Sequence, residues 1–130
     1  MIATMIKDFL IINCIGKDDK LGLRINKDFF TKKIENKTNN ETLVYEILKF
    51  LENYSVILNE SFSVLVNQGP GSFSRLRKSI AVAKGLHISK KVKLYGFKSS
   101  NLTLFSQENI EKILKNNLIE KKLIKPIYLS

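Results

Sequence analysis

The sequence has little of what secreted, membrane-spanning or metal-binding proteins depend on. Its 130 residues include one cysteine, Cys14, one histidine, His87, and no tryptophan. A single cysteine cannot form an intrachain disulfide, and one histidine with one cysteine cannot assemble a His/Cys metal site. No apolar run approaches the roughly 20 residues that a membrane span needs, and the N-terminus lacks the pattern of a secretory signal. We therefore expect a cytoplasmic protein.

Acidic residues are scarce relative to basic ones. Twelve Asp and Glu stand against 22 Lys and Arg, so the formal net charge is +10. A charge of this size favours association with phosphate backbones or acidic partners. Nineteen of the basic residues are Lys, which lacks the bidentate fork with which Arg recognises phosphate. The charge therefore permits contact with RNA but does not by itself distinguish an RNA-binding surface from solvated lysines.

Apolar residues make up 44% of the chain, which is typical of a globular domain. The first part carries three strand patterns separated by turn residues. Phe9 to Ile15 is a continuous apolar run suited to a buried central strand, and Leu21 to Asn26 alternates as a half-buried strand does. Phe29 to Glu35 completes a predicted three-stranded meander.

Two helical patterns follow. Glu41 to Tyr54, with Asn40 as predicted N-cap, repeats apolar residues over an arc of roughly 160°, wider than one core contact requires. Ser74 to Ile88 is apolar or small nearly all round in its second half, which predicts a buried helix. Small residues there would allow another element to approach closely: Ala81, Ala83 and Gly85.

The remaining elements complete the order βββαβαβα. The predicted strands are 62–67 and 91–97, a short helix capped by Ser99 or Ser100 runs through 105, another capped by Ser106 runs through 116, and 125–130 is extended because of Pro126. A meander followed by α/β crossovers builds a mixed sheet flanked by helices. This is the order of the ribonuclease H-like fold, which is also one lobe of the actin-like ATPases.

Metal-dependent nuclease chemistry is not supported by the strand ends. The opening strand carries Asn13 where such nucleases need a carboxylate, and the strand before the corner ends in Asn67. A neutral amide does not supply the anionic oxygens that hold Mg²⁺. The nearest acids have the positions of strand-end and turn residues: Asp8, Asp18 and Asp19.

A Gly-Pro-Gly corner, Gly69 to Ser72, joins the strand at 62–67 to the following helix. A glycine-rich turn at a helix N-terminus suits anion binding, but the Walker A spacing is not met. Arg75 and its basic neighbours Arg77 and Lys78 crowd the positive end of the helix dipole, which is unfavourable unless an anion or acidic surface answers them. The alternative is that they are solvated and that Ser72 or Ser74 caps the helix.

Other catalytic groups are few. His87 lies on a helix predicted to be buried, where a satisfied core residue is expected, and Cys14 in an apolar strand is expected to be an inert small hydrophobe. Ser72 and Ser74 have no base that the sequence can assign to them. We therefore predict no enzyme activity, no catalytic residue, no cofactor and no metal.

The corner and its helix resemble the TsaB (YeaZ) family. GPGSFSRLR at 69–77, followed by AVAKGL at 81–86, is similar to the family signature GPGSFTGLR with its A-x-AKGL continuation. Further segments fall in register with the family: Phe9–Asn13 with its opening strand, 39–43 with a helix start, Tyr95–Ser100 with a strand end, and Pro126–Leu129 with its Pro-x-Tyr-Leu ending.

The resemblance implies a non-catalytic scaffold subunit that pairs with a catalytic paralogue, TsaD. Together they make N6-threonylcarbamoyladenosine at position 37 of tRNA, with an ATPase, TsaE, joining them. It places the subunit interface on the helices at 40–54 and 74–88. The expected interface residues are Leu43, Val44, Ile47, Leu51, Arg75, Arg77, Ile80, Ala83, Lys84 and His87, and the structural corner is Gly69, Pro70, Gly71 and Ser72. Two further possibilities are left undecided: a homodimer in the absence of the partner, and direct contact with tRNA.

The chain also departs from the family. Members are usually near twice this length with two lobes, so residues 1–130 are expected to form one N-terminal lobe without the second, ending in a family-like tail at 124–130. Asn13, Asn39 and Arg75 replace the usual Asp, His and Gly. The rival hypotheses are a small basic RNA-binding module without a catalytic partner and, less favoured, an enzyme or nucleotide binder that uses the corner at 69–77.

Overall fold

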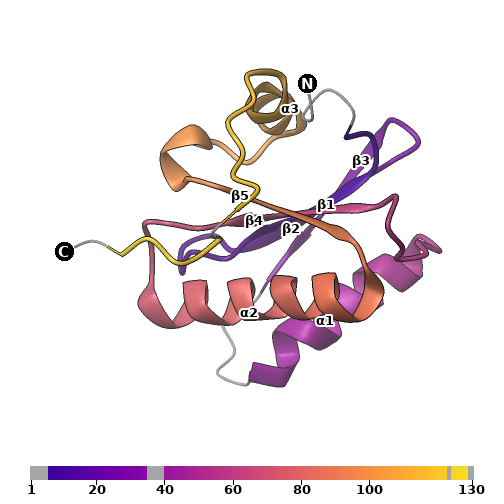
Figure 1. The fold of residues 1–130 in the computed structure, drawn as a ribbon, viewed down its shortest axis with the longest axis horizontal. Helices are drawn as coiled ribbons and strands as arrows, with labels where there is room; N and C mark the ends of the chain where they lie inside the picture. The colour runs from indigo at the N-terminus through magenta and orange to yellow at the C-terminus, as the bar shows by residue number, and fades with distance from the viewer. Residues whose placement is uncertain (1–5, 35–39, 123, 129–130) are drawn as a thin grey trace.

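The computed structural model describes residues 6–34, 40–122 and 124–128. A five-stranded sheet lies between two helices on one face and a third helix on the other (Figure 1). The elements are β1 (Phe9–Asn13), β2 (Lys20–Ile25), β3 (Asp28–Lys33), α1 (Asn40–Asn53), β4 (Ser63–Asn67), α2 (Phe73–Lys90), β5 (Lys93–Phe97), the 3-10 turn η2 (Ser99–Asn101) and α3 (Gln107–Lys115).

The strand order is β3-β2-β1-β4-β5. β1 to β3 form the antiparallel meander predicted from the sequence, whereas β4 and β5 run parallel to β1 because α1 and α2 carry the chain back across the sheet. β1 and β4 lie at the centre and are buried at every position, as continuous apolar runs require. The predicted strands are confirmed within one or two residues, apart from Glu35, which lies outside the described residues.

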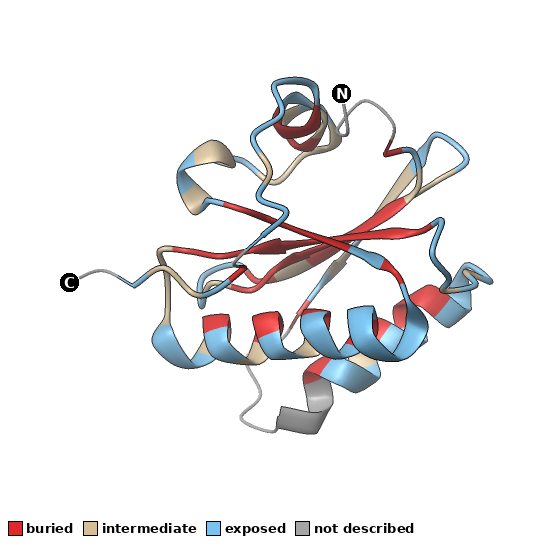
Figure 2. Ribbon diagram, in the orientation of Figure 1, coloured by how far each residue is buried: buried red, intermediate tan, exposed pale blue. Residues whose placement is uncertain are grey.

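The sheet separates two apolar cores, and burial in Figure 2 is concentrated along its strands. One core lies against α1 and α2 and receives alternate residues of the central strands, such as Leu10 and Val64. The other lies against α3 and receives the intervening residues, such as Ile11 and Leu65. The period of two along a strand thus feeds both cores from one run of apolar residues.

The prediction that the second helix is buried all round is wrong. α2 packs through Leu76, Ile80, Ala83 and Leu86, and its opposite side faces solvent, including Ile88 at 72% exposure. Figure 2 shows this outer side in the colour of exposed residues. The physical reason is that α2 and α1 form a single outer layer, so only the side of each helix that faces the sheet has anything to pack against.

The connection after β5 is less helical than predicted. A single 3-10 turn at Ser99–Asn101 replaces the short helix expected through Phe105, whose ring instead lies 6.3 Å from that of Phe29. The next helix is confirmed, because Ser106 caps α3 by accepting a hydrogen bond from Asn109 N at 3.2 Å. Within the described ranges, no helix is both long and apolar enough to cross a membrane.

Candidate functional site

The corner lies beyond the carboxyl ends of β4 and β5, the edge at which α/β sheets commonly bind ligands (Figure 1). Its first peptide bond, Gly69–Pro70, is cis. Gly69 has φ +104°, and a Cβ added there would lie 2.6 Å from the Ile127 carbonyl oxygen. Only glycine fits this position, because both its backbone conformation and the returning C-terminal segment exclude a side chain.

The turn after β1 supports the corner from the other side. Ser72 N donates to the Ile15 carbonyl oxygen at 2.7 Å. A Cβ on Gly71 would lie 2.7 Å from Ile15 Cβ, and one on Gly16 would lie 2.5 Å from Ser72 Cβ. The two loops therefore pack backbone against backbone. Ser72 occupies the predicted N-cap position of α2, but its side chain makes no capping hydrogen bond.

The positive charge of Arg75 at the corner is paired with an acidic side chain of the same chain, Asp19. Arg75 Nε donates to Asp19 Oδ2 at 2.9 Å, while Asp19 Oδ1 accepts from Gly16 N at 2.8 Å. Both side chains are largely buried, with 17% of Arg75 and 3% of Asp19 exposed. From the sequence, Asp19 was expected to be a turn residue and Arg75 an interface residue. Their separation of 56 positions leaves no local signal of the ion pair.

The C-terminal segment returns to the corner. Ile127 N donates to the Gln68 carbonyl oxygen at 2.6 Å, and Gln68 Nε2 donates to the Lys125 carbonyl oxygen at 3.1 Å. The Tyr128 ring lies 4.6 Å from that of Phe73, at the start of α2. Arg77 is not buried here: its guanidinium lies 5.2 Å above the Phe73 ring.

A neutral hydrogen-bond network occupies the strand ends where a nuclease of this fold would need carboxylates. Asn67 Nδ2 donates to Asn13 Oδ1 at 2.7 Å, and Asn67 Oδ1 accepts from Gly69 N at 2.8 Å and Ser99 Oγ at 2.9 Å. Asn67 is 1% exposed, so its amide is committed to holding the three segments together. In the part of the chain that the structure describes, no three His, Cys, Asp or Glu side chains are grouped to hold a metal ion.

The two remaining reactive groups differ from each other in environment. Cys14 is buried as predicted, and burial raises the pKa of its thiol to about 12, with Asp19 adding to the rise and Arg75 opposing it. His87 is exposed, so the prediction of a core residue is wrong. Its Nδ1 lies 2.6 Å from the Val92 carbonyl oxygen, which bridges the end of α2 to the start of β5.

The expected interface residues divide into two groups. Five are buried in the chain's own core and cannot reach a partner in this structure: Leu43, Ile47, Leu51, Ile80 and Ala83. Arg75 is held by Asp19. Four lie on the exposed side of their helices: Val44, Arg77, Lys84 and His87. The helical periodicity located the apolar side of each helix correctly but could not say whether that side faces the sheet or a partner.

Exposed apolar and small residues complete this surface, and of these only Val44 was among the expected interface residues. We name as the outer helical face Val44, Tyr45 and Leu48 of α1 with Ala81, Gly85 and Ile88 of α2. Tyr45 is 59% exposed, and a Cβ added to Gly85 would meet nothing within 4 Å. The spacing of 81, 85 and 88 at three and four residues is the signal that could have found this stripe.

The sheet order and crossovers define an α/β domain of the ribonuclease H-like kind, the fold of one lobe of actin-like ATPases, with a neutral amide network at its strand ends. A scan against models of protein families finds no match. A tRNA threonylcarbamoyladenosine biosynthesis protein TsaB from Buchnera aphidicola (subspecies Schizaphis graminum) is 32% identical over 73 residues, covering 56% of this chain and 34% of that protein.

Solved structures agree on the fold. YeaZ from Pseudomonas aeruginosa superposes with a TM-score of 0.63 at 16% sequence identity, over 72% of this chain and 44% of that one. A crystal structure of a Pseudomonas aeruginosa protein described as similar to peptidase YEAZ gives the same values. The chain is thus similar to TsaB (YeaZ) proteins in sequence over 73 residues and in fold over 72% of its length. It spans less than half the length of the relatives that it matches.

Proposed function

We propose that this chain is a non-catalytic scaffold subunit that binds a TsaD-like catalytic subunit and so supports formation of N6-threonylcarbamoyladenosine in tRNA. The sequence similarity to a TsaB protein of that biosynthesis supports the pathway. In this proposal residues 1–130 act as a single lobe, with the segment 124–130 as its tail. A TsaE-like ATPase would join the same assembly.

The scaffold role is supported by the exposure of the outer helical face. This face places aromatic and aliphatic side chains in solvent on two helices that lie side by side on one face of the sheet (Figure 1). Exposed apolar patches of this kind on a small domain mark interaction surfaces. Gly85 and Ala81 leave the backbone of α2 open to a partner helix, since short side chains permit close helix packing.

The non-catalytic part of the proposal is supported by the strand ends. The side chain of Asn67 is fully used in holding Asn13, Gly69 and Ser99 together. Cys14 is buried with a pKa of about 12, so it is not a nucleophile near neutral pH. The hydrogen bonds of Asn67 stabilise the corner, and the corner in turn sets the position of α2 and its outer side.

Co-purification with the TsaD-like protein of the same organism tests the partner. We expect a complex with the wild type and its loss with Ala81→Glu, which adds a charge on the outer helical face without disturbing the core. Ala83→Glu is unsuitable, because Ala83 is fully buried and the variant would unfold. Thr103→Glu is the matched control, as Thr103 is exposed on the segment between η2 and α3. An undiminished complex with Ala81→Glu would contradict the interface.

Nucleoside analysis of cellular tRNA tests the pathway separately. Deleting the gene should remove N6-threonylcarbamoyladenosine from the tRNA, and expression of the wild type or of Thr103→Glu should restore it. Expression of Ala81→Glu should not. An unchanged level of the modified nucleoside after deletion would exclude the proposed role whatever the binding assay shows.

A further inference from the structure

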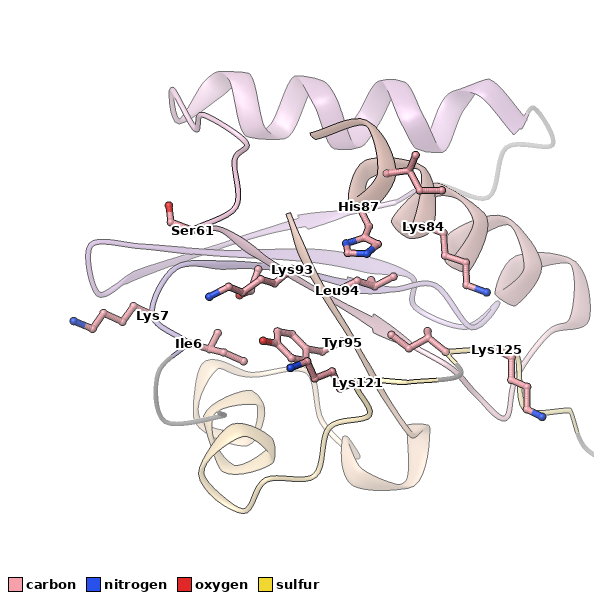
Figure 3. Close-up of a pocket in the computed structure, with 13 residues that line it drawn as sticks. Ile6, Lys7, Ser61, Lys84, His87, Lys93, Leu94, Tyr95, Lys121 and Lys125 are labelled. Atoms are coloured by element: carbon pink, nitrogen blue, oxygen red, sulfur yellow. The ribbon is translucent and has the colours of Figure 1, made fainter. Parts of the chain in front are cut away.

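A pocket of about 850 Å³ lies at the exposed edge of the sheet, away from the corner (Figure 3). It is bounded by the C-terminal half of α2, by the edge strand β5 and by the segment that follows α3. Its floor is apolar, from Leu94, Tyr95 and Ile124, and two hydroxyl side chains, Ser61 and Ser63, reach its wall.

The side chains around the pocket carry charge of one sign. Five of its 13 lining residues are lysines and none is acidic: Lys7, Lys84, Lys93, Lys121 and Lys125. All five are exposed, and none takes part in an ion pair with the part of the chain that is described. They come from four separate segments, so this is not one charged run on a solvated face. Five ammonium groups around one pocket repel one another, and a bound anion would relieve this repulsion.

The arrangement suits a chain of phosphates better than a single one. In Figure 3 the ammonium groups of Lys7 and Lys93 lie toward one end of the pocket, those of Lys84 and Lys125 lie toward the other, and Lys121 lies between. Lysines are point charges that contact successive phosphates, whereas one tightly held phosphate calls for the fork of Arg. Spread charge over an apolar floor therefore fits a nucleic-acid backbone with its sugars.

An acidic peptide is less well suited to the site. A peptide would gain most by adding a strand to the free edge of β5. That edge is already used by the chain itself, because Gly96 N donates to the Glu120 carbonyl oxygen at 2.8 Å and Glu120 N donates back at 2.7 Å. The Gly96–Glu120 bridge thus occupies part of the β5 edge, so an added peptide could not pair along the whole strand.

We propose that this pocket binds the phosphate backbone of structured RNA. The site lies on residues other than the corner, and it does not depend on a protein partner. Ile88 belongs to both the pocket lining and the outer helical face, and Lys84 and His87 adjoin it, so RNA held here would lie beside any subunit bound to α1 and α2.

The test is binding of a tRNA transcript to the isolated protein across a salt titration. Replacing Lys93, Lys121 and Lys125 by Gln should weaken binding roughly 10- to 100-fold and reduce the slope of log K against log salt by about 2 to 3, since each phosphate contact contributes about one. The control triple, Lys17, Lys33 and Lys49 to Gln, has the same net charge and includes no residue that lines the pocket, so it should leave the slope within about one of the wild type.

Three outcomes would overturn the proposal. Equal losses from the two triples would mean diffuse charge, and no loss from the pocket triple would mean that RNA binds elsewhere or not at all. Polyglutamate serves as a model acidic peptide in the same assay. If the pocket triple lost binding to polyglutamate but kept binding to tRNA, the pocket would be assigned to acidic proteins. Circular dichroism confirms folding, and the single variant Lys93→Gln, expected to reduce the slope by about one, replaces the triple if the triple is unfolded.

Discussion

Arg75 and Asp19 form an ion pair at 2.9 Å that joins the first turn of α2 to the turn after β1. The TsaB (YeaZ) signature has a glycine where this chain has Arg75, so the chain carries an additional positive charge at this position. The carboxylate of Asp19, which is nearly inaccessible to solvent, pairs with that charge. The pair therefore fixes the start of α2 to the meander, and through it the direction of the outer helical face.

The first prediction concerns this pair. Arg75→Met leaves the Asp19 carboxylate buried without its cation, and we expect the free energy of unfolding to fall by about 2–4 kcal/mol. Asp19→Asn keeps an acceptor for Gly16 N and removes the charge. A double-mutant cycle on urea unfolding should give a coupling energy of about 2 kcal/mol.

The exposed pair Lys112–Glu108 on α3 is the matched control for that cycle. Its side chains are 62% and 80% exposed, and such pairs couple by only about 0.3–0.5 kcal/mol. A coupling for Arg75 and Asp19 as small as that of the control would show that the pair does not hold α2 in place.

The second prediction concerns the amide network. Asn67→Ala removes the acceptor for Gly69 N and Ser99 Oγ and the donor to Asn13. Because these groups are buried or half-buried, we expect a loss of about 2–3 kcal/mol in the free energy of unfolding, measured by urea titration. Asn59→Ala, which removes exposed hydrogen bonds to Ser61, should change it by less than about 0.5 kcal/mol. Equal effects would contradict the structural role of Asn67.

The third prediction separates stability from binding at Gly85. Open space surrounds the position, so Gly85→Ala should stabilise the isolated protein by about 0.5–1 kcal/mol through improved helix propensity. The same methyl group should weaken the complex with the proposed TsaD-like partner if a helix of that partner packs closely there. Thermal unfolding and a titration with the partner give the two numbers. A gain in stability with unchanged affinity would place the partner elsewhere on the surface.

The fourth prediction follows from the raised pKa of Cys14. With a pKa of about 12 in place of its ordinary 9.0, the thiol is ionised about a thousand-fold less at pH 8 than in the unfolded chain. The folded state holds the thiol proton of Cys14 more tightly than the unfolded chain does. The contribution of this proton to the free energy of unfolding is therefore fully present below pH 9 and is lost as the pH rises toward 12. A thiol reagent at pH 8 should react with Cys14 only after denaturant is added. Rapid reaction of the native protein would show that the segment directly after β1 opens.

Much of the fold could be predicted because it depends on local patterns. The apolar run at Phe9, the alternation at Leu21 to Ile25 and the helical spacing after Asn40 each report a period that the backbone imposes. The Gly-Pro-Gly corner could be placed as well, since glycine at positive φ is a local requirement. The α2 helix was located correctly, but which of its sides faces solvent was not.

The candidate site was predicted less well, for a physical reason. Leu43 and Ile80 have the same apolar character as Ile88, yet the first two pack against the sheet and the third lies in solvent. Whether an apolar side chain is a core residue or an interface residue depends on how many layers cover it, and no period in the sequence encodes that number. The same holds for His87, whose exposure follows from its place at the end of α2.

The amino-acid sequence was enough to predict the order of strands and helices and the corner at Gly69–Ser72, and it shows the excess of positive charge. These depend on neighbouring residues and on composition. The tertiary structure alone decided that Asp19 meets Arg75, that Asn13 meets Asn67, and that five lysines from four segments surround one pocket. Each of these brings together residues far apart in the chain, which only the folding of the chain places near one another.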